Sequence, residues 1–248
     1  MTGADAPLVA VFAAYADRID DLNARRESAR VLSRDVTKDS KNTIFLLHRA
    51  TTGDRDKLLR QGATKLETIR GKIAKWTEYI VSEKEYHQFL YSISPGFQEY
   101  VEAEAFLHYL NHGTLVTKDE IQLGLLRCNA DLVRISLTTH DYLLGIADLS
   151  GEVMRFAVGC ASSGNFDGVK HACVFMRKLL AKCEYLSGMG RVKDWPGKVE
   201  VMRSSTIKVE IALYKLYLQK LEFPDRPLTL SSDAFERSSD QRESIGCT

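Results

Sequence analysis

Two pairs of acidic residues stand at spacings that put the members of each pair on one face of a helix. Glu99 and Glu102 are three residues apart, and Asp148 and Glu152 are four apart, so each pair projects in one direction. Like-charged pairs at this spacing destabilise a helix slightly, and four carboxylates brought together would raise one another's pKa unless a cation neutralised them. Cation binding is therefore the chemistry that these residues could perform together.

The ion that suits such a set is a hard divalent one. Carboxylate oxygens are preferred ligands of Mg²⁺ and Mn²⁺, and Mg²⁺ usually keeps several waters while binding one or two carboxylates and the phosphate oxygens of a substrate. An ion held in this way can generate hydroxide and stabilise the charge that develops on a phosphodiester. The candidate metal ligands and catalytic acids are thus Glu99, Glu102, Asp148 and Glu152.

Spacing alone leaves other interpretations open. Each acidic pair by itself favours a solvated helix face, and the two pairs together still leave that interpretation ahead, because spacing does not show that the two helices face each other. A carboxylate-bundle oxidoreductase is a further alternative. Di-iron bundles use a Glu-x-x-His pattern, and neither acidic pair has a histidine at that offset, so the sequence disfavours it.

The histidines do not form a metal motif. His108 and His112 are four apart, but no H-E-x-x-H accompanies them. Helical rotation points them nearly opposite to the first acidic pair, which favours packing or capping near Gly113. Glu104 also lies well round the helix from Glu102, so it is not assigned to the metal. The remaining histidines are isolated along the sequence and are interpreted as structural: His48, His87, His140 and His171.

The elements that must position the acids are helices. Helical periodicity dominates and no sustained period-two alternation occurs, so we expect an all-α fold, a single-domain bundle of about seven helices with short connections. The helices expected from periodicity, caps and glycine stops cover residues 8–51 (one helix or two in tandem), 54–81, a short segment opened by Ser82 and Glu85, a segment from Ser94-Pro95 to Gly113, one opened by Thr117 and Glu120, 138–163, 167–188 and 196–222.

Two features of these helices invite explanation. Gly145 and Gly151 lie inside the 138–163 helix, where glycine costs about 1 kcal/mol relative to alanine, so we expect a neighbouring helix or a ligand to come close there. The first helix carries an apolar stripe that a bundle would bury against another helix: Leu8, Phe12, Tyr15, Ile19 and Leu22.

Composition bounds the remaining possibilities. The chain has 34 basic and 33 acidic residues among 248, so net charge says little about partners. Basic residues outnumber acidic ones between Arg25 and Lys75, which could attract phosphate backbones, although a solvated helix face is the simpler interpretation. Five cysteines form no CxxC pair, which favours a reducing compartment. The N-terminus predicts neither a signal peptide nor a membrane span, so we expect a cytoplasmic protein, with a nuclear location left open.

The C-terminal residues differ in composition from the rest of the chain. Residues 224–248 are polar and rich in Ser, Asp and Arg, which is typical of disorder. Residues 1–223 are accordingly predicted to be one helical domain and 224–248 a disordered tail. Cys247 lies in that tail and is interpreted as a bystander, and Gly188-Met189-Gly190 as a helix stop.

Three blocks of the sequence resemble the family of translin-associated factor X (TRAX). They are SRDVTKDSKNTIFLLHR at 33–49, FQEYVEA at 97–103 and DYLLGIADLSGEVMR at 141–155, and the similarity extends loosely over residues 8–222. The resemblance implies a translin-like helical bundle that assembles with translin into a closed hetero-oligomer, usually an octamer. It also implies a Mg²⁺-dependent endoribonuclease of small RNA or transfer-RNA precursor fragments, active only in complex with translin.

The resemblance also assigns roles to residues. The catalytic acids of the family match Glu99, Glu102, Asp148 and Glu152 in type. Because contacts to phosphate give affinity without sequence preference, we expect recognition of single-stranded or unpaired RNA. A non-enzymatic scaffold that binds translin or nucleic acid remains the alternative. The candidates for holding the RNA backbone are Lys38, Lys41, His48, Arg49 and Arg155.

Overall fold

The computed structural model of the chain describes residues 6–131, 135–187, 192, 194–224, 227, 228 and 230. Within these residues it contains seven α-helices and no strand, which confirms the all-α prediction. The elements are α1 (Ala6–His48), the 3-10 turn η1 (Arg49–Thr51), α2 (Arg55–Ala74), the 3-10 turn η2 (Lys75–Glu78), α3 (Glu83–His112), α4 (Lys118–Cys128), α5 (Thr139–Ser162), α6 (Phe166–Ser187) and α7 (Trp195–Glu222).

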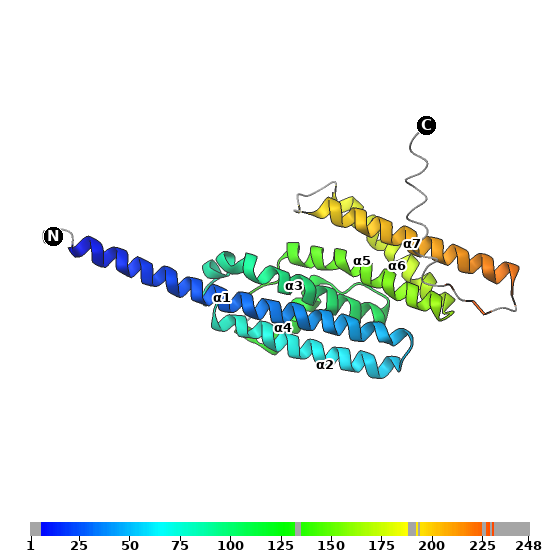
Figure 1. Cartoon of the computed structure of the whole chain (residues 1–248), viewed down its shortest axis with the longest axis horizontal. Helices are drawn as coiled ribbons and strands as arrows, with labels where there is room; N and C mark the ends of the chain where they lie inside the picture. The colour runs from blue at the N-terminus through cyan, green and yellow to red at the C-terminus, as the bar shows by residue number, and fades with distance from the viewer. Residues whose placement is uncertain are drawn as a thin grey trace, which may run out of the picture.

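The helices α3 and α5 lie in the middle of the bundle. α1 packs against α3 and α2, and α5 packs against α3 on one side and against α6 and α7 on the other, while α4 lies against α2 (Figure 1). The interior is rich in large aromatic side chains, including the edge-to-face pair of Trp76 and Phe97, whose ring centres are 4.8 Å apart. This arrangement places the two helices that carry the acidic pairs side by side.

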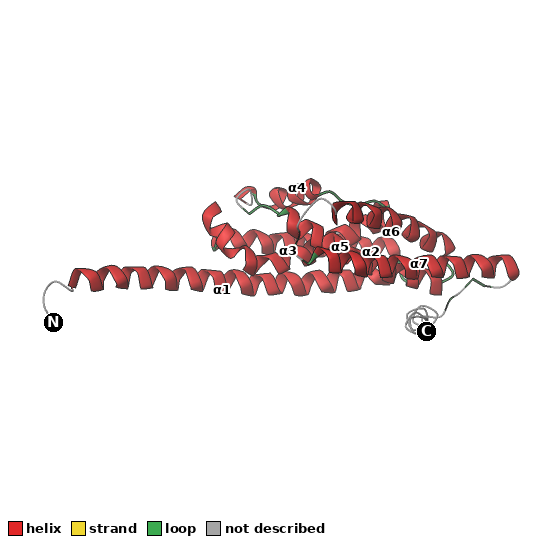
Figure 2. Cartoon of the chain, turned by 90° about the horizontal axis from the view of Figure 1, so that it is seen from above, coloured by secondary structure: helices red, strands yellow, loops and turns green. Residues whose placement is uncertain are grey.

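The N-terminal part of α1 extends past the rest of the bundle (Figures 1 and 2). The chain therefore forms one long helix here rather than two in tandem. Its predicted apolar stripe is not buried: Leu8 is 58% exposed and Phe12 64%, and only Leu22, where α1 reaches the bundle, is partly covered. The expectation that the bundle buries this stripe is wrong for the chain by itself, because α1 is longer than the helices beside it.

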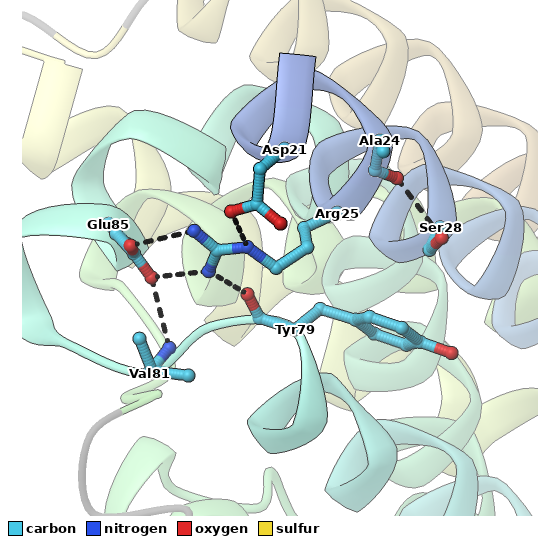
Figure 3. A network of polar contacts seen from close by, with 7 residues as sticks. All are labelled: Asp21, Ala24, Arg25, Ser28, Tyr79, Val81 and Glu85. Carbon is cyan, nitrogen blue, oxygen red and sulfur yellow. Dashed lines mark hydrogen bonds and ion pairs between the residues drawn. The ribbon is translucent and has the colours of Figure 1, made fainter. Parts of the chain in front are cut away.

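A polar network joins α1 to the start of α3 (Figure 3). The Arg25 guanidinium donates to both carboxylate oxygens of Glu85, at 2.9 and 3.0 Å, to the Tyr79 carbonyl at 3.0 Å and to Asp21 at 3.0 Å. Glu85 also accepts the backbone N–H of Val81 at 3.1 Å. The hydrogen bond from Arg25 is the main cause that lowers the pKa of Glu85. The network fixes the direction in which α1 leaves the bundle.

α3 is one continuous helix, although the sequence predicted that a second helix would begin at Ser94-Pro95. That prediction is wrong, and α1 supplies the reason. A proline inside a helix removes a backbone donor. Beside it, the Ser33 hydroxyl of α1 accepts the Gly96 N–H at 3.1 Å and donates to the Ile93 carbonyl at 3.3 Å. A Cβ on Gly96 would lie 2.7 Å from that hydroxyl oxygen, so glycine lets the two helices meet.

The helix predicted over residues 54–81 is shorter than expected: α2 ends at Ala74, and the 3-10 turn η2 follows over Lys75–Glu78. Trp76 and Ile80 are nevertheless buried, so their apolar spacing extended the predicted helix too far.

The remaining helix boundaries agree with the sequence signals. Ser82 caps α3, and Thr117 with Glu120 forms the predicted capping box of α4. Gly164, with a φ of 76°, follows the end of α5. α6 and α7 begin and end within a residue of the predicted positions.

Some predictions lie outside the described residues, namely the glycine stop at 188–190, Cys247 and most of the tail at 224–248. The division into a domain at 1–223 and a tail stays a prediction. None of the helices in the described residues is long and apolar enough to span a membrane.

Candidate active site

Close contact between α3 and α5 brings the two acidic pairs to one place. A Cβ added to Gly145 of α5 would lie 2.6 Å from the Gln98 carbonyl oxygen and 2.8 Å from the Val101 side chain of α3. Only glycine permits this approach, as its position in the helix predicted. Gly151 is different, because a Cβ there would meet nothing within 4 Å; it lines a cavity instead.

A buried aspartate sets the register of the two helices. Asp141, only 1% exposed at the start of α5, accepts hydrogen bonds from the Ser94 hydroxyl, from the Gln98 side-chain amide at 3.0 Å and from the Thr138 hydroxyl at 2.7 Å. Ser94 and Gln98 belong to α3. The network holds the start of α5 on α3 just before the acidic residues, and sequence spacing gave no sign of it beyond the matching family block.

All four predicted acids line one cavity of about 730 Å³, here called the acidic cavity. α1, α3, α5 and α7 each contribute to its wall. Spacing had left open whether the two acidic helices face each other, and the structure shows that they do. Its polar and aromatic lining side chains include Lys41, Phe45, His48, Thr51, Glu99, Glu102, Asp148, Glu152, Arg155 and Lys198.

Three of the four acids are paired with cationic or imidazole groups. Lys41 lies 3.1 Å from Glu99, and Lys198 forms an ion pair with Asp148. The carboxylate of Glu152 lies 2.5 Å from the Nε2 atom of His48 and 2.8 Å from the Arg155 guanidinium. α1, α5 and α7 thus each bring positive or potentially positive groups to the acids.

Glu102 is the exception. It is 9% exposed, and among the described residues no side chain or backbone group forms a hydrogen bond or an ion pair with it. Burial, together with the negative charges of Glu99, Glu152 and Asp148, raises its pKa to about 8. A carboxyl group at that value is mostly protonated at neutral pH, which makes Glu102 the most perturbed acid of the cavity and a candidate functional group.

The pKa values of two neighbouring acids move in opposite directions. Burial raises the pKa of Glu99, against the opposing effect of Lys41. Burial also acts to raise the pKa of Glu152, but the hydrogen bond with His48 and the charge of Arg155 outweigh it, so the pKa of Glu152 is lowered. The cavity therefore holds acids whose pKa values are moved apart by their surroundings, which is the usual starting point for acid–base chemistry.

The oxygen atoms of the acidic cavity are the type of ligand that a hard divalent ion prefers, but the side chains are not arranged around a single ion. Four carboxylates offer all-oxygen ligation, and Glu102 is a buried carboxyl group to which no described residue donates a hydrogen bond. Within the described residues, however, no three acidic, histidine or cysteine side chains are grouped so that they could hold a metal ion. Mg²⁺ requires only one or two protein carboxylates and completes its shell with water. Ligation by more of them would require the ion pairs with Lys41 and Lys198 to open.

The structure divides the five residues predicted to hold RNA. Lys41, His48 and Arg155 line the acidic cavity, whereas Lys38 and Arg49 do not. His48, which the sequence also interpreted as structural, is isolated only along the sequence, because α1 brings its ring to Glu152 across 104 positions of the chain.

Sequence reasoning missed several residues of the cavity. Lys198 comes from α7, far from the acids in sequence and without a recognisable motif, so spacing could not identify it. Phe45 is 74% exposed and Thr51 lies in η1; both line the cavity. The block at residues 33–49, which contains Lys41, Phe45 and His48, was the one sequence signal that pointed to α1.

The residues set aside by the sequence lie elsewhere. His108 contacts the Thr114 hydroxyl at 3.0 Å, and its ring packs on His112 with ring centres 4.6 Å apart, which confirms packing near the end of α3. Glu104 forms an ion pair with Arg70 and accepts the Tyr100 hydroxyl at 2.6 Å. None of these side chains lines the acidic cavity.

A sequence comparison decides the family. The family described as the Translin family matches residues 24–220. The chain belongs to the translin family. Translin-associated protein X of Mus musculus is 32% identical over 96% of this chain and 88% of its own length. Translin-associated protein X homolog of Schizosaccharomyces pombe is 30% identical over 93% of this chain and 96% of its own length. These values confirm the resemblance of the three sequence blocks.

Solved structures share the translin fold of this chain. A crystal structure of apo-NeC3PO has a TM-score of 0.66 at 20% identity and covers 82% of this chain and 95% of that one. A structure of AfC3PO in complex with duplex RNA has a TM-score of 0.59 at 19% identity and covers 87% of this chain and 99% of that one. At such identities the likeness shows the helical architecture.

Proposed function

We propose that this chain is the catalytic subunit of a translin-type endoribonuclease that hydrolyses RNA phosphodiester bonds with Mg²⁺, or with Mn²⁺ in its place. The observation that carries the proposal is the convergence of Glu99, Glu102, Asp148 and Glu152 on one cavity, with lysine and arginine side chains at its wall. The proposed substrates are single-stranded or unpaired stretches of small RNA or of transfer-RNA precursor fragments.

The four carboxylates would hold the ion, some of them through water. A bound divalent cation supplies positive charge and a nucleophilic hydroxide next to a phosphodiester. Without an ion, burial and the neighbouring acids raise the pKa of Glu102 to about 8. A divalent cation would favour its ionised form, in which Glu102 could serve as a ligand or as a general base. Glu152, whose pKa is lowered, stays ionised and keeps His48 in place.

The cationic side chains would bind the RNA backbone. Lys41 is 64% exposed and Arg155 65% exposed at the side chain, so both can reach a phosphate while their stems remain on α1 and α5. Lys198, which comes from α7, adds a third contact. Such contacts give affinity without sequence preference.

The proposed partners are translin subunits in a hetero-oligomer, in the family's usual form an octamer. The relatives of this chain are named for association with translin, and a related fold is seen in complex with duplex RNA. The exposed apolar stripe at the start of α1 supports the need for partner subunits, since contiguous exposed apolar side chains mark surfaces that bind other proteins.

A second candidate function is a non-enzymatic scaffold for translin and nucleic acid. The pairing of Glu99, Asp148 and Glu152 with cations favours it, because the charges are balanced without an ion. In that case the acids would stabilise the bundle, and cleavage of RNA would be absent from the pure complex.

Cleavage of labelled single-stranded RNA by the chain co-purified with translin, in Mg²⁺ and in EDTA, separates the two functions. We expect Glu102→Ala to keep assembly on gel filtration and RNA binding but to lose cleavage. Glu104→Gln is the matched control, because Glu104 lies two residues away on α3 and outside the cavity; it should cleave as the wild type does. Unchanged cleavage by Glu102→Ala would contradict the proposal.

A further inference from the structure

A second cavity, larger than the acidic one, lies at the C-terminal end of α3 and along α6. Its volume is about 950 Å³, and it shares no lining residue with the acidic cavity. We call it the α6 cavity and define it by Tyr109, Phe156, His171, Phe175, Lys178 and Lys182. Nothing in the proposed hydrolysis uses these residues.

The charged side chains that line the α6 cavity are mostly basic. Lys178 and Lys182 are exposed and four residues apart, so they stand about one turn, or roughly 6 Å, from each other on the same face of α6. Neither lysine forms an ion pair or a hydrogen bond with another described residue. His171, seven residues before Lys178, continues the same face. Asp167 is the sole acid among the lining residues.

A third cation at this cavity already has a structural role. The Arg55 guanidinium donates a hydrogen bond to the Leu110 carbonyl in the last turn of α3, where positive charge stabilises a helix end. Arg55 is therefore not counted as a ligand group, and the two lysines are the ammonium groups that the described part of the fold leaves without an anion at this cavity.

The wall beside the lysines is aromatic. The ring of Phe175 packs on Tyr109 with centres 4.6 Å apart, and Tyr109 meets Phe156 edge-on at 6.0 Å. Tyr109 and Phe156 are buried, whereas Phe175 is partly exposed, so Phe175 offers a ring supported from behind. Aromatic rings beside free lysines are the combination by which proteins bind nucleotides, with the base on the ring and the phosphate on the ammonium group.

We propose that the α6 cavity binds a phosphate-bearing nucleotide, with the phosphate on Lys178 and Lys182 and the base against Phe175. The nucleotide can be free or part of a single RNA strand, since both carry the same chemical group. The site requires neither the four carboxylates nor a metal ion, so it stands independently of the proposed hydrolysis.

Fluorescence anisotropy of a labelled single-stranded oligoribonucleotide with the full chain in EDTA tests the site. We expect the double substitution Lys178→Glu and Lys182→Glu to weaken binding about tenfold or more. Removing one ammonium group that binds a phosphate of a single strand should reduce the slope of log affinity against log salt by about 0.7. Lys170→Glu is the matched control: Lys170 is exposed on the same helix but lines another cavity with Phe166 and Arg177, and it should bind as the wild type does.

Two further arms identify the ligand and its location. Competition by adenosine monophosphate would show that a free nucleotide suffices, whereas competition by unlabelled oligonucleotide alone would restrict the ligand to a strand. Photo-cross-linking of a 4-thiouridine RNA should label the peptide that carries Phe175. Equal affinity of the double variant and the wild type, or cross-links confined to peptides of the acidic cavity, would overturn the proposal. Labelling of the peptide that carries Phe175 should be the same in EDTA and in Mg²⁺, which separates this test from that of the hydrolysis.

Discussion

The acidic cavity and the α6 cavity use the same kinds of cation in opposite ways. At the acidic cavity, Lys41 and Lys198 are paired with Glu99 and Asp148, and one buried acid remains without a partner among the described residues. At the α6 cavity, Lys178 and Lys182 form no ion pair with any residue that the structure describes. The difference teaches that the chemistry open to a cavity depends on which charges stay unbalanced, and that a nearly neutral chain can leave a carboxyl group unpaired in one cavity and ammonium groups unpaired in another.

The basic stretch between Arg25 and Lys75 supports the same conclusion. Several of its members are engaged in ion pairs inside the bundle: Arg25 with Glu85, Lys72 with Asp39, and Arg70 with an acid of α3. These pairs join α1 and α2 to their neighbours. An excess of basic residues along the sequence therefore does not translate into a continuous phosphate-binding face.

The largest expected effect concerns the unbalanced acid of the acidic cavity. Folded protein keeps the Glu102 proton up to about pH 8, whereas the unfolded chain releases it near the ordinary value of 4.5. Since the folded state binds more protons in that range, its free energy of unfolding should fall as the pH rises from about 4.5 to 8 and level off above. Glu102→Gln removes this dependence, a difference of at most about 5 kcal/mol between the two ends of the range.

Denaturant unfolding of wild type and Glu102→Gln at several pH values in EDTA measures this. Glu102→Gln should gain stability relative to the wild type as the pH approaches 8. A constant difference across the range would mean that Glu102 is ionised in the folded protein, and the contrast between the two cavities would then lose its main support.

A smaller effect should separate the two glycines of α5. Gly145→Ala forces a Cβ against the Gln98 carbonyl and should destabilise the fold by about 1–3 kcal/mol, as overpacking does. The Cβ added by Gly151→Ala would point into the open acidic cavity. This variant should stabilise α5 by up to about 1 kcal/mol, because alanine has a higher helix propensity than glycine. Thermal unfolding of both variants checks the prediction, and equal effects would refute the close approach of α3 and α5.

The smallest expected effect is the difference in stability between removing a lysine that forms an ion pair and removing one that does not. Lys198→Met removes a partly exposed ion pair and should lower the free energy of unfolding by about 0.2–1 kcal/mol. Lys178→Met breaks no ion pair or hydrogen bond with a described residue and should change it by less than about 0.5 kcal/mol. Urea unfolding of the two variants side by side measures both, and a larger decrease for Lys178→Met would show that this lysine has a structural partner.

Most of the fold could be predicted from the sequence because its signals are local. Each of these signals depends on a few neighbouring residues: the caps at Ser82 and Thr117, the glycine stop at Gly164 and the helical periodicity. The structure confirms them. Pro95 misled for the same reason: the hydroxyl that lets α3 continue past it comes from Ser33, on another helix. The exposed stripe of α1 likewise depends on how far the neighbouring helices reach.

The acidic residues of the candidate site could be predicted from the sequence, but most of the cationic residues that pair with them could not. Glu99, Glu102, Asp148 and Glu152 stand in two local patterns, and the family blocks connect them. Lys198 reaches the cavity only through the packing of α7 on α5, and His48 only through the packing of α1. Such contacts between distant segments leave no spacing to read in a single sequence.

Binding of Mn²⁺ to the complex of this chain with translin tests the central claim most directly, namely that the four carboxylates form a metal-dependent centre. Electron paramagnetic resonance reports free Mn²⁺ during a titration. The wild-type complex should bind Mn²⁺ at a site that Glu102→Gln weakens strongly and that Glu104→Gln leaves intact. Identical binding curves for the wild type and Glu102→Gln would contradict the account.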